Sequence, residues 1–364
     1  MGTIEMKRTL SIFLILIFIL SGASAANAKT TEAIGSTCPK EKLISQSNDG
    51  KFMCTKLDGK LTWQINTIQN QLNIWNNIQK IRATKLKAST ALDVRFSPTV
   101  NKTLANSILN SVDQAARLWQ EQYLPKEPLP TLFFTEKDRS WFIAQIKSIG
   151  VYNSEKVAQF DDEVKRNSNR ANWAGISGQN GKLWMTFMIG TAKQTPDTND
   201  FEVAAHEYTH LAQQEITKFS NGSGEQVACW QIEGGAFFYG VYLGAKNPQQ
   251  LRELIFARNS DAYYLNFSGL NKQPLNSFES LLDKYGIKYD HQVCGPDGAY
   301  PVGSAGMEYL YYLKGHQGTI DLLANIASQG SFTMGIEVTF GKDWSKIRKE
   351  MANYIKLVVI QSKY

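Results

Sequence analysis

The sequence is poor in histidine and cysteine, and it carries little excess charge of either sign. Each of these two residues occurs four times in 364 residues, and the formal net charge is +6. Spread over this length, that charge does not provide the basic surface of a nucleic-acid-binding protein. The densest basic stretch, Lys80 to Lys87, is most simply a solvated helix face, with a polyanion site as the alternative. We therefore expect no nucleic-acid partner.

Clear internal repeats and low-complexity runs are also missing. Hydrophobic residues make up 43% of the chain and charged residues 20%, so the chain can bury a sizeable core. Its length suits one large domain with two lobes, or two to three small domains.

A long apolar run occurs at the N-terminus, between Leu10 and Leu20, after the basic pair Lys7-Arg8. The run is too short to span a bilayer comfortably. It is followed by two small-x-small cleavage sites, Ala23-Ser24-Ala25 and Ala26-Asn27-Ala28. Residues 1–28 therefore predict a cleaved signal peptide and a secreted protein, with an uncleaved signal anchor as the alternative. No cysteine lies near these sites, so we expect no lipid anchor and no stable membrane anchor after cleavage.

Export makes the four cysteines candidates for disulfides. Cys38 and Cys54 enclose a short loop and predict a small disulfide-closed β unit, which would stabilise the fold by up to about 3 kcal/mol. For Cys229 and Cys294 we favour a second disulfide. Free buried thiols, or Cys229 as a metal ligand, remain as alternatives.

The most informative segment is Ala204 to Gln213, which contains the pattern His-Glu-x-x-His and is predicted to be helical. Positions four apart share one face of a helix, so His206 and His210 can offer two imidazoles to one metal ion. Glu207 lies one step round the helix, where it can reach a metal-bound water without being a ligand. This arrangement is typical of zinc hydrolases.

Glu233 is the candidate for a third protein ligand. It follows His210 after 22 intervening residues, enough for the first helix to end and a second to return beside it. The neighbouring Gly234, Gly235 and Ala236 would let the two helices approach closely, although Gly235 should weaken its own helix by about 1 kcal/mol relative to alanine. Two imidazoles and one carboxylate leave a fourth zinc position open, as catalysis requires.

From about Leu92 to the C-terminus, the sequence resembles the gluzincin metallopeptidases. The resemblance lies in the two motif histidines, the motif glutamate and the Trp-x-x-Glu-Gly-x-Ala form around Glu233, which is closest to the peptidase MA-like branch, relatives of the thermolysin and aminopeptidase groups. It implies one Zn²⁺ per chain, held by His206, His210 and Glu233, with Glu207 as general base. Phe237 stands where some relatives carry an acidic residue, so no orienting partner of the histidines is identified.

The same resemblance implies a donor that stabilises the oxyanion formed from the substrate carbonyl. Tyr300, in a Tyr-x-x-Gly element, is the first candidate and His291 the second, and a third alternative is that neither residue acts. Gluzincins also bind an extended peptide along an edge strand beside the active-site helix. Leu183 to Ile189 is placed to be that strand, or to be a half-buried strand without a ligand role.

The periodicity before the motif helix predicts alternating strands and helices. We expect strands at 92–96, 130–135 and 182–189, helices at 101–123 and 137–149, and a turn at 177–181. After Glu233 the pattern is nearly all helical, at 248–257, 277–285, 304–313, 319–329 and 345–356, with His316 in a loop.

The chain is therefore expected to be α+β, with a mixed N-terminal lobe, a mostly helical C-terminal lobe and the active site between them. The predicted division is a signal peptide at 1–28, a small Cys/Trp β segment at 29–64, a connecting helix at 65–90, the mixed lobe at 91–217 and the helical lobe at 218–364.

These features lead to two hypotheses. The first is a secreted zinc peptidase that hydrolyses peptide bonds of a peptide or protein substrate by zinc-activated water. The alternative is an inactive or accessory exported binding protein that keeps the fold. The intact Glu207 favours the first, because a binding-only descendant has no need of the general base.

Overall fold

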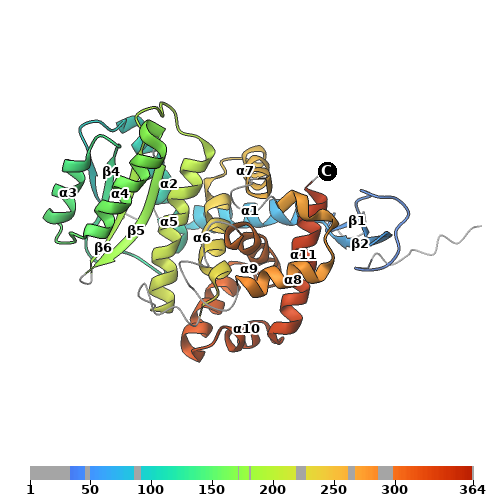
Figure 1. The fold of residues 1–364 in the computed structure, drawn as a ribbon. Helices are drawn as coiled ribbons and strands as arrows, with labels where there is room; N and C mark the ends of the chain where they lie inside the picture. Colours follow the sequence, from blue (N-terminus) through green and yellow to red (C-terminus); the bar gives the residue numbers. More distant parts are fainter. Residues whose placement is uncertain are drawn as a thin grey trace, which may run out of the picture.

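The computed structural model describes residues 33–45, 50–85, 92–170, 172–179, 182–218, 227–260, 267–285 and 298–362. Within these ranges the protein is a mixed α/β structure with eleven α-helices and two sheets (Figure 1). The predicted signal peptide lies outside the described residues. None of the helices in the described part of the chain combines the length and apolarity needed to cross a membrane.

The elements follow in chain order. They are β1 (Phe52–Leu57), β2 (Lys60–Ile65), α1 (Thr67–Thr84), β3 (Leu92–Phe96), α2 (Lys102–Trp119), β4 (Leu129–Phe134), α3 (Arg139–Ser148), α4 (Ser154–Asn167), β5 (Asn172–Gln179), β6 (Lys182–Ile189), α5 (Thr198–Thr217), α6 (Cys229–Gly244), α7 (Pro248–Ser260), α8 (Leu275–Lys284), α9 (Ala299–Gln329), α10 (Phe332–Phe340) and α11 (Trp344–Gln361). Short 3₁₀ turns lie at Ser168–Arg170 and Phe267–Lys272.

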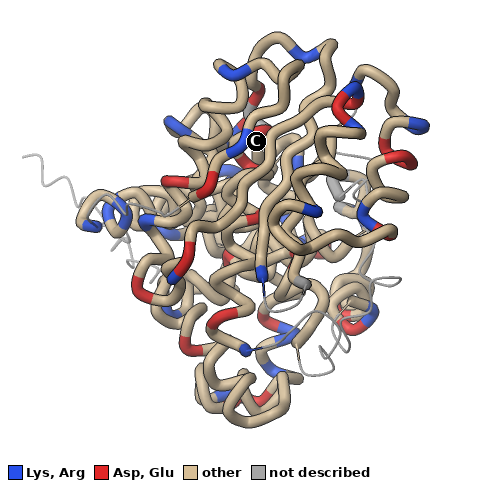
Figure 2. The backbone as a smooth tube through the Cα atoms, turned by 90° about the vertical axis from the view of Figure 1, so that its left-hand side faces the viewer, with Lys and Arg blue, Asp and Glu red and all other residues tan. Residues whose placement is uncertain are grey.

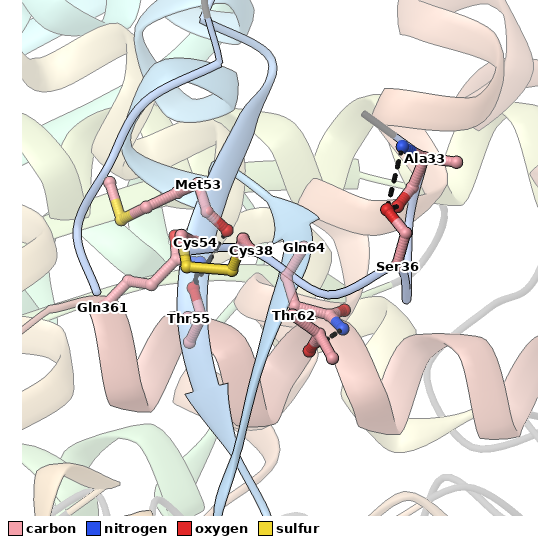
Figure 3. Close-up of a disulfide and its surroundings, with 9 residues drawn as sticks. All are labelled: Ala33, Ser36, Cys38, Met53, Cys54, Thr55, Thr62, Gln64 and Gln361. Atoms are coloured by element: carbon pink, nitrogen blue, oxygen red, sulfur yellow. Dashed lines mark hydrogen bonds between the residues drawn. A yellow bond between two sulfur atoms is a disulfide. The ribbon is translucent and has the colours of Figure 1, made fainter. Parts of the chain in front are cut away.

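The N-terminal segment forms the predicted β unit. Strands β1 and β2 pair antiparallel around a two-residue turn in which Asp58 and Gly59 have φ of 48° and 83°. Positive φ at both positions fits Asp-Gly and twists the two strands as a hairpin requires. The disulfide between Cys38 and Cys54 is present and confirms that pairing (Figure 3).

This hairpin is tied to the C-terminal helix by Gln361, which is fully buried. The Gln361 Oε1 accepts hydrogen bonds from the Thr67 N–H and the Thr67 hydroxyl, both at 2.8 Å. Its Nε2 donates to the Ile65 carbonyl at 2.9 Å and to the Thr55 hydroxyl at 3.0 Å. Figure 3 shows Gln361 beside the disulfide-bearing strand. The two ends of the described chain therefore pack together.

The larger sheet has the strand order β3-β4-β6-β5. Strands β3, β4 and β6 are parallel, and β5 runs antiparallel at the edge. The prediction that Leu183 to Ile189 forms the edge strand is wrong, because β5 pairs with β6 along its whole length and takes the edge. The predicted turn at 177–181 is wrong for the same reason over residues 177–179, which belong to β5.

The two faces of this sheet are covered by different helices, as Figure 1 shows. On one face, Leu132 and Phe134 of β4 pack with Phe142 of α3 and Phe160 of α4. Phe133, which lies between these two residues in the strand, points to the other face and joins the main core of α2, α5 and the later helices. This alternation follows from the two-residue period of a strand.

The described part of the densest basic stretch, Lys80 to Lys85, lies at the end of α1 and contacts the α2 region. Arg82 donates to Gln114 of α2, and Lys85 forms an ion pair with Glu121. Lys and Arg are interspersed with Asp and Glu over the described part of the chain (Figure 2).

From α6 onward the described chain is helical. The two helices expected at 304–313 and 319–329 form α9, which is kinked at Gly315 with φ 64° and ψ −163°. The prediction that His316 lies in a loop is wrong. It follows the kink and is buried, with its Nδ1 2.8 Å from the Tyr239 hydroxyl and its ring against Trp119.

His316 should make stability depend on acid. Burial and the charge of Lys85, only partly opposed by Glu121, lower the pKa of His316 to about 4. In the unfolded chain this histidine has its ordinary pKa of about 6.5, so the unfolded state binds the proton more tightly than the folded state. This contribution is therefore complete above about pH 6.5 and is lost as the pH falls toward 4, at a cost of about 2 kcal/mol between pH 7 and 4.5.

Urea unfolding of wild type and His316→Asn at pH 7 and at pH 4.5 measures the contribution of His316 to the free energy of unfolding. The variant should be less stable at pH 7, because ring contacts are lost, but its stability should fall about 2 kcal/mol less on acidification. Equal losses in the two proteins would assign the acid sensitivity to other groups.

Candidate metal centre

Helices α5 and α6 bring together the three residues predicted as metal ligands. His206 and His210 lie one turn apart on α5, and Glu233 lies in the first turns of α6. One ligand atom from each lies within 4.8 Å of both others. The two Nε2 atoms are 3.0 Å apart, and Glu233 Oε2 lies 3.6 Å from His206 Nε2 and 3.4 Å from His210 Nε2.

These separations fit one small metal ion. A tetrahedral ion with bonds of about 2.0–2.1 Å requires ligand atoms about 3.3 Å apart. The three observed distances, 3.0, 3.4 and 3.6 Å, bracket that value. Two nitrogen donors and one oxygen donor also match the chemistry that Zn²⁺ prefers at sites with an open position.

The charges of the buried ligands are matched to one another. Burial alone would lower the pKa of His210, but the neighbouring Glu233 outweighs it and raises that pKa to about 9. Burial would likewise raise the pKa of Glu233, but His210 and His206 hold it well below its ordinary value. A metal ion bound to these atoms must displace the proton of His210.

Glycines of α6 set how closely the helices approach, though not all toward the same partner. A Cβ on Gly234 would lie 2.3 Å from the Gly303 Cα of α9. A Cβ on Gly235 would instead lie 3.0 Å from Gln213 of α5. The predicted close approach to the motif helix is therefore made through Gly235, whereas Gly234 brings α9 against α6.

Glu207 faces the edge of the larger sheet. Its Oε2 accepts a hydrogen bond from the Ile176 N–H of β5 at 3.1 Å. Its charge also acts on Lys156 of α4, where burial lowers the lysine pKa and Glu155 and Glu207 partly oppose that effect. Neither β5 nor α4 was predicted from the sequence, so the surroundings of Glu207 come from the fold.

Tyr300 lies in the first turn of α9, beside the ligands. Its ring is parallel to that of His206, with centroids 5.6 Å apart and an interplanar angle of 5°. The Phe237 ring packs edge-on against it at 5.7 Å. His291, the second candidate for the oxyanion donor, lies outside the described residues.

Cys229, at the start of α6, is disulfide-bonded and is therefore not a metal ligand. Its predicted partner, Cys294, lies outside the described residues. None of the cysteines that the structure describes is free.

Two residues beside the ligands were missed by the sequence analysis. Gln213 Oε1 lies 2.8 Å from His210 Nδ1, and Glu202 Oε1 lies 3.8 Å from His206 Nδ1. Burial, and then the charge of Glu207, raises the pKa of Glu202 well above its ordinary value. Their positions, four residues before the first histidine and three after the second, place them on the same helix face and could have revealed them.

The arrangement combines three side chains that could hold a metal ion, the neighbouring carboxylate of Glu207, and a tyrosine ring stacked on His206. No family model, no curated protein and no solved structure matches this chain.

Proposed function

We propose that the protein is an exported zinc-dependent peptidase of the gluzincin type. The observation that carries the proposal is the convergence of His206, His210 and Glu233 at the spacing of one tetrahedral ion, with Glu207 next to the first ligand on the same helix. The spacing within α5 alone brings the two histidines together. The packing of α6 against α5 adds the buried Glu233 carboxylate, whose Oε2 lies 3.6 Å from His206 Nε2 and 3.4 Å from His210 Nε2, and this third donor supports a metal site.

In this proposal His206, His210 and Glu233 hold one Zn²⁺ per chain. When bound, zinc supplies Lewis acidity, which lowers the pKa of a coordinated water to about 7. Glu207 would take a proton from the water that attacks the peptide carbonyl and would pass it to the amine released when the C–N bond breaks. The Ile176 N–H keeps the Glu207 carboxylate oriented meanwhile, through the hydrogen bond at 3.1 Å.

The substrate is proposed to be a peptide or protein that adds as a strand to the outer edge of β5, the last strand of the larger sheet. Backbone groups of alternate residues on an antiparallel edge strand point away from the sheet. Ile176 is one of these residues, and its N–H reaches Glu207. An extended peptide on this edge would pass the carboxylate, so β5 takes the role first assigned to Leu183–Ile189.

The proposed active site lies between a mixed lobe and a helical lobe. Support comes from α5, which contacts both the β5 edge and helices α6 and α9. Export is proposed from the apolar N-terminal run, and the disulfides at Cys38–Cys54 and Cys229 agree with an oxidising compartment.

Tyr300 is proposed as the donor to the oxyanion. The change Tyr300→Phe should lower turnover by about 10- to 1000-fold, because it removes one hydrogen bond to a developing charge. Zinc content should stay the same, since the ring against His206 is retained. Steady-state kinetics with a fluorogenic peptide, alongside zinc analysis, measures both. Unchanged turnover would exclude Tyr300 and direct attention to His291.

The deciding experiment measures zinc in the purified mature protein and digests a broad peptide library with wild type and Glu207→Gln. Cleavage by wild type that the variant loses supports a peptidase. A protein that binds zinc but cleaves nothing would fit the alternative, an exported binding protein that keeps the fold.

A further inference from the structure

We propose that Glu202 and Gln213 are positioning residues that orient the two histidine ligands, and that Gly235 and Gly240 of α6 leave the space they occupy. The inference rests on the proposed metal site. Metal-binding histidines generally need a partner on the second ring nitrogen, which fixes the ring and makes it a better ligand. The residue one turn after Glu233 is Phe237, which cannot accept a hydrogen bond.

Gln213 provides this contact for His210. Its Oε1 lies 2.8 Å from His210 Nδ1, and its Nε2 donates to the Ile232 carbonyl of α6 at 3.0 Å. The side-chain amide therefore joins one ligand on α5 to the backbone next to the third ligand, Glu233. Because both ends of the amide are bound, the imidazole ring has one preferred orientation.

Glu202 is placed to do the same for His206. Its carboxylate is buried, and Oε1 lies 3.8 Å from His206 Nδ1. That distance is longer than a hydrogen bond, so the proposal requires the two side chains to approach each other when the metal is bound. A buried carboxylate is costly without a polar partner, so its position behind a ligand indicates a role toward that ligand.

The two glycines explain how these side chains fit between the helices. A Cβ on Gly240 would lie 2.8 Å from Glu202 Oε1 and 2.7 Å from the Glu202 carbonyl oxygen. A Cβ on Gly235 would lie 3.0 Å from Gln213 Nε2. Glycine in a helix interior is unfavourable relative to alanine. The side chains of Glu202 and Gln213 explain why glycine stands at these two positions, because each fills the space that a Cβ would take.

The two histidine ligands and their two proposed positioning residues lie along one face of α5. At 100° per residue, Glu202, His206, His210 and Gln213 fall within an arc of about 80°. The pattern Glu-x-x-x-His-Glu-x-x-His-x-x-Gln therefore contains two ligands and both of their partners. Helix α6 then contributes the third ligand and the space.

The test is zinc affinity, measured by competition with a chelator on the full mature protein. Glu202→Met and Gln213→Met keep the side-chain length but remove the acceptor. Each should weaken zinc binding by about 10- to 100-fold, the usual effect of losing an outer partner. Glu202→Gln keeps an acceptor oxygen and should lose less. The control is Glu215→Gln, an exposed carboxylate on the same helix, which should bind zinc like wild type.

Gly235→Ala separates positioning from folding. The added methyl contacts only the far end of Gln213, so the metal-free protein should unfold no earlier than wild type. Zinc binding should nevertheless weaken by several-fold. In a Gln213→Ala background the methyl has room, and the same glycine change should have no further effect. The absorption of the Co²⁺-substituted proteins should shift in the same variants, because it reports ligand geometry.

Wild-type affinity in both methionine variants, or an equal effect of Gly235→Ala in both backgrounds, would overturn the proposal while leaving the metal site in place. Failure of the wild type to bind zinc would overturn the proposed function as well. Weakened binding in the methionine variants, with an unchanged unfolding midpoint of the metal-free protein, is the result expected.

Discussion

Alanine at His206 or His210 is expected to abolish stoichiometric zinc binding. Wild type should contain about one zinc per chain, and each variant should bind it more than about 100-fold more weakly, beyond the usual loss for an outer partner. The reason is geometric, since the two Nε2 atoms lie 3.0 Å apart and each supplies one of only three proposed protein ligands. Elemental analysis after dialysis against a weak chelator, with Glu215→Gln as the matched control, measures this.

Glu233→Ala tests the ligand that does not belong to the motif. It removes the only oxygen donor of the three proposed ligands, and with it the negative charge 3.4 Å from His210 Nε2, so zinc binding should be greatly weakened. Full zinc content in this variant would show that the third ligand is wrong. Asp290 and His291, outside the described residues, would be tested next.

Contacts between residues of one helix could be predicted from the sequence, whereas contacts between separate elements could not. His206 and His210 are fixed by the turn of one helix, so their shared face could be predicted from spacing alone. Glu233 lies on another helix, so the sequence could offer it only as a candidate, from the length of the intervening segment and from the Trp-x-x-Glu-Gly-x-Ala pattern around it. The N–H of Ile176 could not be predicted, because it reaches Glu207 only through the pairing of β5 with β6.

The same distinction explains the errors in the fold. Strands β3 and β6 have strong local patterns, and their bounds match the prediction. Strand β5 contains Gly175 and Gly178, which favour a turn locally, but its pairing with β6 overrides that preference. Likewise Gly235 indicated a weakened helix in the sequence, whereas in the fold it is a point of close contact with α5.

Glu207→Gln is expected to separate catalysis from metal binding. Glutamine keeps the size of the side chain and an oxygen that can accept the Ile176 N–H, so folding and zinc content should remain those of wild type. It cannot accept the proton that Glu207 is proposed to transfer. Peptide hydrolysis should therefore fall by at least about 100-fold, the lower range for loss of a positioned acid–base group.

Hydrolysis rates are measured at zinc saturation, and zinc content and the unfolding midpoint are measured on the same samples. Together they show whether the lost activity reflects the missing proton acceptor or a loss of zinc or folding. The double variant Glu207→Gln with Tyr300→Phe should lose less than the product of the two single losses, because both residues would serve one transition state. Retained hydrolysis in Glu207→Gln would assign the base elsewhere.

If the zinc-loaded wild type cleaves nothing in a diverse peptide library, and Glu207→Gln binds every tested partner as wild type does, the peptidase proposal fails. A binding role for the exported protein would then replace it, because only catalysis requires a proton acceptor at this position.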